Sequence, residues 1–498
     1  MQISVAYVSI GRYIYRPMNT PYFPAWRRKL AAVARRVSRS RQQTPVEIES
    51  QCRRFLSARA LTPPTEGKRR RRVFFHSRVF WCFLWQVLQP RTSCRAVVRQ
   101  VQAFCETEQR HFDENTSAYC QARGRLPIAC LQQALTDSAQ AADRLSLQGV
   151  PDWTRPIKVV DASSVRLPDT DANRKLYPYP SGQRPGCGFP VMQVCGLYSL
   201  ASGAILKTVQ GPWAANEVRL FKDLWPELRS GDILMGDRPF GAYVLLALLP
   251  LRGVDVVGRL HQGRRFNRRN AKKIGPSQWL VTWTKPPKRP DYLTGEEWST
   301  APDQITVRIL HVRVATKGFR TKELWISTTL LDPIAYPAEQ VAHLYLRRWD
   351  MELCFRDLKT AMGMEELRCR SPAMVHKELL AFLVAHNFIR CLIAEAASAH
   401  QVCRTRISFK GTVDAARSFY QAMRLARSAR KAISLYRRLI DILARDLVPL
   451  RPGRREPRAV KRRPKPYARL TKPRHLFREV PHRGNRIQQK PGRKPRLT

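Results

Sequence analysis

The sequence lacks the cysteine patterns, long apolar runs and leader segment that mark metal-thiolate, membrane and secreted proteins. Its 498 residues include 12 cysteines, but no two stand three positions apart, so the CxxC motif of zinc and redox sites is missing. The longest apolar runs, 79–88 and 240–251, are shorter than the ~20 residues that cross a bilayer. Residues 1–15 have no basic segment followed by a cleavable apolar core. We therefore expect reduced, mostly buried thiols and no membrane partner.

Acidic residues are scarce as well. The chain has 38 Asp and Glu against 89 Lys and Arg, which gives a formal net charge of +51. A charge of this sign and size attracts polyanions, and nucleic acids are the soluble candidates. An anionic membrane surface is the alternative, but the basic residues are spread along the chain and not gathered on one amphipathic helix. The composition, together with the missing leader and membrane segments, therefore predicts a nucleic-acid-binding protein that stays in the cytoplasm or at the nucleoid.

Four polar residues stand at fixed intervals within residues 341–367. Tyr345, Arg348, Glu352 and Lys359 are separated by three, four and seven positions. On one continuous α-helix these intervals place the four side chains in a stripe roughly 60° wide. One acid, two cations and a phenol would then share a helix face. The alternative is a solvated face on which Arg348 and Glu352 form an ordinary ion pair.

Two aspartates follow short apolar runs that predict buried strands. Asp161 ends the run IKVVD, and Asp237 ends DILMGD. If these strand ends meet Glu352, three carboxylates can bind two divalent cations, and carboxylate oxygens suit Mg²⁺ or Mn²⁺. Such a metal pair stabilises the attacking and leaving oxygens of an in-line phosphoryl displacement. A capping or turn role is the alternative for either aspartate, above all for Asp237, which precedes Arg238 and Pro239.

The spacing Y-x2-R-x3-E-x6-K, found here as YLRRWDMELCFRDLK, resembles the signature of the IS4 family of DDE transposases, which includes the Tn5 and Tn10 enzymes. The stretches around Asp161 and Asp237 resemble this family too, as do MGMEELRCRSPAMVHKELL and RISFKGTVD. The likeness spans roughly residues 70–440, and the three acids in this order are a specific signal.

The resemblance implies a role for each of these residues. Three acids would be catalytic and would hold two Mg²⁺ ions per active site, for which Mn²⁺ can substitute: Asp161, Asp237 and Glu352. Three further side chains would bind the DNA phosphate beside the cleavage site: Tyr345, Arg348 and Lys359.

The order of predicted elements indicates an α/β protein. The strands and helices of residues 157–260 follow the order βββαβαβ of an RNase H-like core, in which the first and fourth strands are neighbours. An inserted β-subdomain, a helical N-terminal domain and C-terminal helices are expected around it. The expected domains are a basic arm (1–45), a helical DNA-binding domain (46–150), the first part of the core (151–260), the β-rich insertion (261–337), the catalytic and following helices (338–400), the C-terminal helices (401–450) and a disordered basic tail (451–498). For residues 46–150, a packing domain without DNA contacts is the alternative.

Tryptophans are present in the expected insertion. In the resembling enzymes, a segment at this point grips the transposon end and holds a flipped base against a tryptophan. Trp325, 27 residues before Glu352, stands where that tryptophan is expected. A base stacked on an aromatic ring gains ~1–3 kcal/mol. The other candidates are Trp279, Trp283 and Trp298, and an ordinary core position is the alternative for each.

The predicted function is a cut-and-paste DNA transposase that excises and inserts an insertion sequence. By resemblance to the Tn5 branch, excision proceeds through a DNA hairpin. The expected partners are the terminal inverted repeats of the element, target DNA and a second copy of the chain in the DNA complex. Two alternatives remain open: a metal-dependent nuclease without strand transfer, and a non-catalytic DNA-binding protein descended from a transposase.

Overall fold

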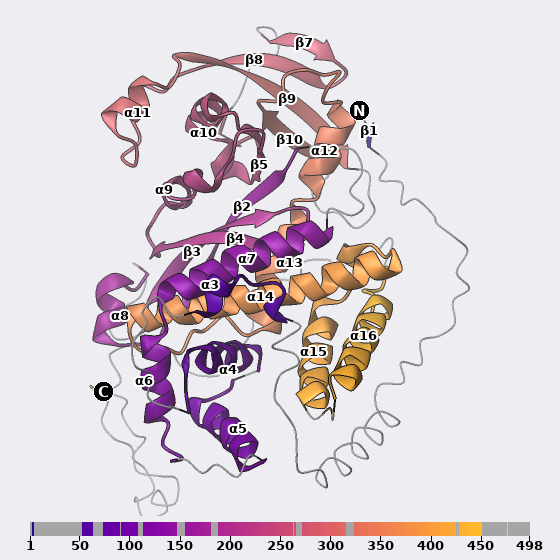
Figure 1. The fold of residues 1–498 in the computed structure, drawn as a ribbon. Coiled ribbons are helices and arrows are strands. Elements are labelled where there is room, and N and C mark those ends of the chain that lie inside the picture. Colours follow the sequence, from indigo (N-terminus) through magenta and orange to yellow (C-terminus); the bar gives the residue numbers. More distant parts are fainter. Residues whose placement is uncertain are drawn as a thin grey trace, which may run out of the picture.

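One long sheet runs through the protein, and helices pack on both of its faces (Figure 1). The computed structural model describes residues 2–3, 52–62, 73–89, 91–107, 113–146, 155–180, 188–261, 263–264, 271–314, 323–424, 426, 428–450 and 476. The predicted basic arm and basic tail lie outside these residues, apart from Gln2, Ile3 and Leu476. The described part is a mixed α/β protein, as the sequence predicts.

Five strands form the predicted central part of the sheet: β2 (Ile157–Arg166), β3 (Val191–Ser199), β4 (Ile205–Pro212), β5 (Ile233–Gly236) and β6 (Asp255–Arg259). They lie in the order β4-β3-β2-β5-β6. β3 is antiparallel to β2 and β4, whereas β5 is parallel to β2 and β6. All nine residues of β3 are buried, because helices cover both of its faces. The first and fourth core strands are therefore neighbours, which confirms that prediction.

The predicted β-rich insertion contributes four strands: β7 (Lys272–Gly275), β8 (Gln278–Thr284), β9 (Gln304–Val314) and β10 (Glu323–Thr328). β10 pairs antiparallel with β6, so the sheet continues through all of them, and β1 (Gln2–Ile3) pairs with β9. The expected subdomain is therefore not a sheet of its own. Its strands extend the core sheet, because the edge of β6 offers unpaired backbone groups that β10 satisfies.

The sequence also predicts the helices on each side of the core. The N-terminal helices are α3 (Ala58–Leu61), α4 (His76–Leu88), α5 (Cys94–Thr107), α6 (Ser117–Arg125) and α7 (Ile128–Ser146). The C-terminal helices are α14 (Pro372–His400), α15 (Phe409–Arg424) and α16 (Ala429–Arg445). Short helices connect the strands: α8 (Asp171–Leu176), α9 (Glu217–Lys222), α10 (Tyr243–Leu248) and α11 (Gly295–Ser299).

The helix α14 is long and apolar enough to cross a membrane by length and composition. However, 94% of the most apolar 18-residue stretch of this helix is buried inside the fold. It packs against α4, α7, α15 and α16, as Figure 1 shows. Its composition is therefore that of a core helix.

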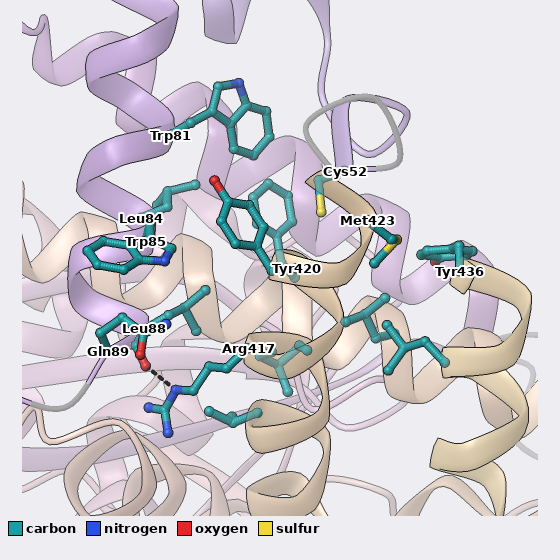
Figure 2. A pocket seen from close by; sticks show the side chains of 16 residues that line it. Cys52, Trp81, Leu84, Trp85, Leu88, Gln89, Arg417, Tyr420, Met423 and Tyr436 are labelled. Atoms are coloured by element: carbon teal, nitrogen blue, oxygen red, sulfur yellow. Dashed lines mark hydrogen bonds between the residues drawn. The ribbon is translucent and has the colours of Figure 1, made fainter. Parts of the chain in front are cut away.

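A small apolar pocket lies where α4, α14, α15 and α16 meet (Figure 2). Its volume is about 90 Å³, and aromatic and aliphatic side chains dominate its lining. Trp81 and Phe388 stack with ring centroids 6.0 Å apart. At its edge, the Arg417 Nε donates a hydrogen bond to the backbone carbonyl of Leu88, drawn as a dashed line in Figure 2. The pocket thus joins the N-terminal helices to the C-terminal ones by apolar packing.

Candidate active site

Asp161 lies within β2, and Asp237 directly follows the neighbouring strand β5. In each residue pair of β2 and β5, from Ile157 with Ile233 to Val159 with Met235, the partners differ by 76 positions. Asp161 and Asp237 also differ by 76 positions, and each follows the last pair, Val159 with Met235, by two residues. Neighbouring strands are ~4.8 Å apart, and the two carboxylates therefore start from adjacent positions of the sheet.

The strand around Asp161 is longer than the sequence suggests. We expected it to end at Asp161, but β2 continues to Arg166. Beyond Asp161 it stays paired with β3, from Gly196 to Val191, whereas β5 ends at Gly236. Asp161 therefore lies within a strand, at the point where the neighbouring strand stops.

Asp237 occupies the N-cap position of a short 3-10 turn, Arg238–Gly241, but its side chain makes no capping hydrogen bond. Its Oδ1 atom is buried and has no hydrogen-bond partner among the described residues. The preceding Gly236 is required by packing, because a Cβ there would lie 2.5 Å from the Cβ of Phe240. The local sequence thus places Asp237 at a strand end without engaging its carboxylate, and the capping alternative is not observed.

Burial raises the pKa of the Asp161 carboxyl from 3.8 to about 6. The backbone N–H of Ala162, 2.9 Å from Oδ1, and the nearby charge of Arg348 lower the pKa again, whereas Glu352 and Glu217 raise it. These influences place one cation and two further acids around Asp161. The charges of Arg348, Glu352 and Glu217 therefore act on Asp161, and the predicted convergence of the three acids stays a prediction.

The segment that carries Tyr345, Arg348, Glu352 and Lys359 is not one regular helix. It consists of α12 (Ala338–Leu346), α13 (Trp349–Arg356) and a π-helical turn, Asp357–Ala361. Between α12 and α13 the hydrogen bonds shorten to three-residue spacing, as from the Arg348 N–H to the Tyr345 carbonyl (3.0 Å). In the π-turn the Met362 N–H donates to the Asp357 carbonyl (3.0 Å), five residues back. The single stripe expected from ideal helix geometry is therefore interrupted twice.

Arg348 is a buried cation at the centre of the site. Its side chain is 7% exposed and donates a hydrogen bond from NH2 to the Glu352 Oε1, 2.7 Å away. Burial tends to lower the pKa of this guanidinium, but Tyr345, Asp237 and Glu352 hold the pKa above its ordinary value. The ion pair considered as an alternative does form. Arg348 is buried and lies near Asp237, whereas the Glu352 side chain is 50% exposed, so the pair links the buried site to a solvated part of the helix face.

Tyr345 is 1% exposed, and its hydroxyl has no hydrogen-bond partner in the part of the chain that the structure describes. Burial raises the pKa of this phenol, Arg348 lowers it, and Asp237 raises it. Tyr345 therefore faces Arg348 and Asp237, and its unpaired hydroxyl is available for a ligand.

Lys359 lies apart from these residues. Burial lowers the pKa of its ammonium, and the charges that act on it are Glu365, which raises the pKa, and Arg166, which lowers it. Arg166 itself is bound to Glu365 (2.8 Å) and Glu366 (3.2 Å) at the far end of β2. The π-turn thus places Lys359 beside Arg166 and Glu365, and the structure does not bring it to Asp161 and Asp237.

A fourth acid, Glu217, was missed by the sequence analysis. It begins α9, directly after the N-cap residue Asn216, and burial and the charge of Asp237 raise the pKa of its carboxyl. Glu217 in turn raises the pKa of Asp161. An acid in the first turn of a helix is common for electrostatic reasons, so the sequence offered no signal that separates Glu217 from a helix-start residue.

The side chains of Asp161 and Asp237 fit a divalent cation, but Glu352 does not join them to complete a three-carboxylate site. Asp161 is a desolvated carboxylate, and Asp237 has a buried oxygen without a partner. Carboxylate oxygens are the donors that Mg²⁺ and Mn²⁺ take. No group of three His, Cys, Asp or Glu side chains among the described residues is close enough to hold a metal ion. The Glu352 carboxylate instead accepts a hydrogen bond from Arg348.

Trp325 lies on β10 and is stacked on both His311 and Trp279, with centroid distances of 4.3 and 5.9 Å. The rival Trp283 is buried, with Arg264 4.1 Å above its ring, and Lys285 lies 4.9 Å from the centre of the Trp298 ring. Trp325 is thus part of an aromatic group that spans β8, β9 and β10. The base-holding role of Trp325 stays a prediction.

Comparison with known proteins identifies the kind of domain that this chain carries. Residues 152–388, which include the three predicted catalytic acids, match the transposase DDE domain family. The chain is 23% identical over 391 residues to the transposase InsG for insertion sequence element IS4 of Escherichia coli (strain K12), over 78% of this chain and 85% of that protein. A cryo-EM structure of the piggyBac transposase synaptic complex with hairpin DNA overlaps 76% of this chain and 79% of that one, at 10% identity and a TM-score of 0.37, which is too low to carry an argument. The chain therefore carries a transposase DDE domain and is similar along most of its length to an IS4 transposase, which confirms the predicted resemblance to the IS4 family of DDE transposases.

Proposed function

We propose that this protein is a metal-dependent transposase that cuts and rejoins DNA at the ends of an insertion sequence. The observation that carries the proposal is that Asp161 on β2 and Asp237, directly after the parallel neighbour β5, both follow the last β2–β5 pair by two residues, with the charges of Arg348 and Glu352 acting on Asp161. The strand order β4-β3-β2-β5-β6 supports an RNase H-like core, extended by the strands β7 to β10. The transposase DDE domain that contains these residues supports DNA as the substrate.

Asp161 and Asp237 would hold the first divalent cation, and Glu352 would complete a two-ion centre. Mg²⁺ is the expected ion, and Mn²⁺ can substitute. When bound, such ions supply an activated water and neutralise the charge that develops during in-line phosphoryl displacement. The chain supplies a poorly hydrated setting in which the attraction between carboxylate and cation is little screened by water.

Arg348 has a further task in this proposal. Its guanidinium now donates to Glu352, but a planar guanidinium fork also matches a phosphate and binds it with two parallel hydrogen bonds. A DNA phosphate would replace Glu352 as the acceptor of Arg348. Glu352 would then be released toward Asp161, and the unpaired Tyr345 hydroxyl would donate to the same phosphate. DNA binding would thereby complete the acidic centre.

The course of the reaction is inferred from the IS4 resemblance. Hydrolysis of one strand at the element end frees a 3′-OH, which attacks the opposite strand to form a hairpin, and the reopened end is joined to target DNA. Each active site handles one end, so two copies of the chain would bridge the two terminal inverted repeats. The net charge of +51 favours binding to the terminal inverted repeats and to target DNA. It also suits a protein located in the cytoplasm at the nucleoid.

The test is an excision and joining assay with purified protein, Mg²⁺ and DNA that carries the inverted repeats flanking its own coding sequence. Wild type is compared with Glu352→Gln, and Glu339→Gln on α12 is the matched control because that acid is exposed and lies outside the site. We expect excision and joining with wild type and the control, and loss of both with Glu352→Gln.

The other functions give different results in the same assay. Nicking without end joining would indicate a nuclease. DNA binding without cleavage by wild type would indicate a non-catalytic DNA-binding protein. Cleavage that survives both Glu352→Gln and removal of divalent cations with EDTA would contradict the proposal.

A further inference from the structure

Arg390 of α14 is a buried arginine that joins α13, the helix of Glu352, to the rest of the fold. Its Nη2 donates a hydrogen bond to the Asp357 Oδ2, 2.9 Å away, where the π-turn begins. The same nitrogen lies 3.2 Å from the Cys354 Sγ, almost one turn earlier on α13. The side chains of Arg390 and Asp357 are each only 11% exposed, so their ion pair is buried. One arginine thus holds both α13 and the π-turn.

The guanidinium of Arg390 is enclosed by other elements as well. Its Nε is 3.4 Å from the His386 Nε2, and its central carbon lies 4.9 Å from the centre of the Phe409 ring on α15. Gly203, in the turn between β3 and β4, has a φ of 74°, and a Cβ there would come within 3.4 Å of the Arg390 Nε. The Gly203 carbonyl in turn lies 3.7 Å from the Cys354 Sγ. These contacts restrict the side chain of Arg390 to one position.

Arg390 contacts the face of α13 that is opposite to Glu352. At about 100° per residue, Cys354 lies roughly 160° from Glu352 around the helix axis. Accordingly, Cys354 is buried, whereas the Glu352 side chain is 50% exposed. α13 also contacts β2, the strand of Asp161. The contacts of Arg390 therefore help to set how α13 is rotated on the sheet, and with it the direction in which Glu352 points.

The segment after the π-turn is bound to β2. The Leu367 N–H donates to the Arg166 carbonyl, and the Arg166 N–H donates to the Glu365 carbonyl, both at 3.0 Å. The wider turn of the π-helix must therefore fit between α13 and this bound segment. A π-turn that began at another residue would rotate α13 relative to β2. The Arg390–Asp357 pair fixes the residue at which the π-turn begins.

Stability alone is a poor explanation for this ion pair. A buried ion pair often contributes no more to stability than apolar side chains of similar volume would. What the charges add is a directional contact with one defined partner. Single π-turns within helices are also frequent at functional sites.

We propose that Arg390 is a positioning residue for DNA cleavage, which fixes the π-turn at Asp357 and thereby the direction of Glu352. This inference rests on the proposed function, because it requires Glu352 to act in cleavage. Arg390 does not touch the DNA or the reacting atoms and acts only through α13. Loss of the ion pair therefore lowers the rate of cleavage more than it lowers the stability of the chain.

The test compares cleavage rate and stability in four variants of the full chain. The double variant Arg390→Met with Asp357→Leu replaces the pair by apolar side chains, Asp357→Asn keeps the shape without the charge, and Arg390→Lys keeps the cation. Phe388→Ala is the matched control, because Phe388 lies on the same helix but stacks on Trp81, away from α13. Single-turnover cleavage of an element end with saturating protein and Mg²⁺ gives the rate. Fluorescence anisotropy gives the affinity for the same DNA, and calorimetry gives the melting temperature.

We expect the double variant to melt close to wild type and to bind the element end equally well. It should cleave about 10- to 100-fold more slowly, because a catalytic group displaced by roughly 1 Å can lose that much rate. Asp357→Asn should be slowed in the same range, and Arg390→Lys by less than about tenfold, because the lysine keeps a cation beside Asp357. Phe388→Ala should melt at a clearly lower temperature and still cleave at the wild-type rate per folded molecule.

Two outcomes would overturn the inference, and they differ. If the double variant and Asp357→Asn cleave at the wild-type rate per folded molecule, the pair serves only packing and the proposed function is untouched. If wild type binds the element end but does not cleave it, the proposed function fails and the role of Arg390 falls with it. Should the double variant not fold, Asp357→Asn decides by the same criterion.

Discussion

The acidic centre and the apolar pocket between the helices contain opposite kinds of side chain: charged ones at the centre, and mostly aromatic and aliphatic ones in the pocket. At the centre, Glu217 and Glu352 raise the pKa of Asp161, and Asp237 raises that of Glu217, as nearby like charges do. In the pocket, rings such as Trp81 and Phe388 stack, and Arg417 is tied to the Leu88 carbonyl (Figure 2). Burial of apolar area stabilises the fold, whereas burial of uncompensated charge opposes it. The pocket therefore holds the protein together, and the centre reduces its stability in favour of binding.

The largest expected effect of this contrast is on catalysis. Asp161→Asn should reduce DNA cleavage ~10³-fold or more, because a group that acts directly on the reacting charge contributes on this scale. The same change should leave the melting temperature of the metal-free protein unchanged or higher, because it removes a like charge. Cleavage assays and calorimetric melting of one preparation measure both. A variant that loses stability together with activity would show that Asp161 is structural.

A substitution in the apolar pocket should have the opposite effect: it should lower stability and leave cleavage almost unchanged. Phe388 is 5% exposed, so Phe388→Ala should lower the free energy of unfolding by about 3–5 kcal/mol through lost burial and a cavity. Cleavage per folded molecule should change little, because the pocket lies among helices away from the strand acids. Denaturant unfolding gives the first quantity. Trp213→Ala is the control, because Trp213 is 46% exposed and should be almost neutral.

The pH dependence of stability follows from the pKa of Asp161, which is about 6 in the folded protein against an ordinary 3.8. Below pH ~4 the Asp161 carboxyl is protonated in the folded and in the unfolded state, so it does not change the free energy of unfolding. Between pH 4 and pH 6 the unfolded chain loses the proton first, so this group destabilises the fold increasingly, by up to about 3 kcal/mol. The stability difference between Asp161→Asn and metal-free wild type should therefore grow in favour of the variant from pH 4 to pH 7, as measured by urea unfolding. A constant difference would contradict the raised pKa.

The smallest expected effect distinguishes the contributions of Arg348 and Lys359 to DNA cleavage. Arg348→Lys should weaken DNA cleavage by roughly 1.5–3 kcal/mol, about 10- to 100-fold, because a lysine cannot form the bidentate bond to phosphate. Lys359→Ala should cost less than tenfold, because Lys359 lies beside Arg166 and Glu365 and not at the strand acids. Single-turnover cleavage of an element end measures both. A larger loss for Lys359→Ala would mean that the π-turn rearranges when DNA binds.

Much of the centre was predictable because its parts are local in the sequence. The apolar runs before Asp161 and Asp237 indicate strands, and the order of elements indicates which strands are neighbours. The intervals among Tyr345, Arg348 and Glu352 survive the break between α12 and α13, since they span about two helical turns. The interval to Lys359 does not survive, because it crosses the π-turn.

The sequence by itself indicated the three candidate acids and determined the main strand and helix types and the basic character of the chain, because composition, motif spacing and short-range periodicity carry them. Only the tertiary structure decided how they combine. The π-turn begins at Asp357, a buried residue bound 2.9 Å from Arg390 of α14, a partner 33 positions away that no local pattern reveals. The register of β2 on β5 likewise depends on packing between distant segments. Long-range contacts set these positions because each contact gains its free energy only when the whole sheet and its two helical layers are assembled.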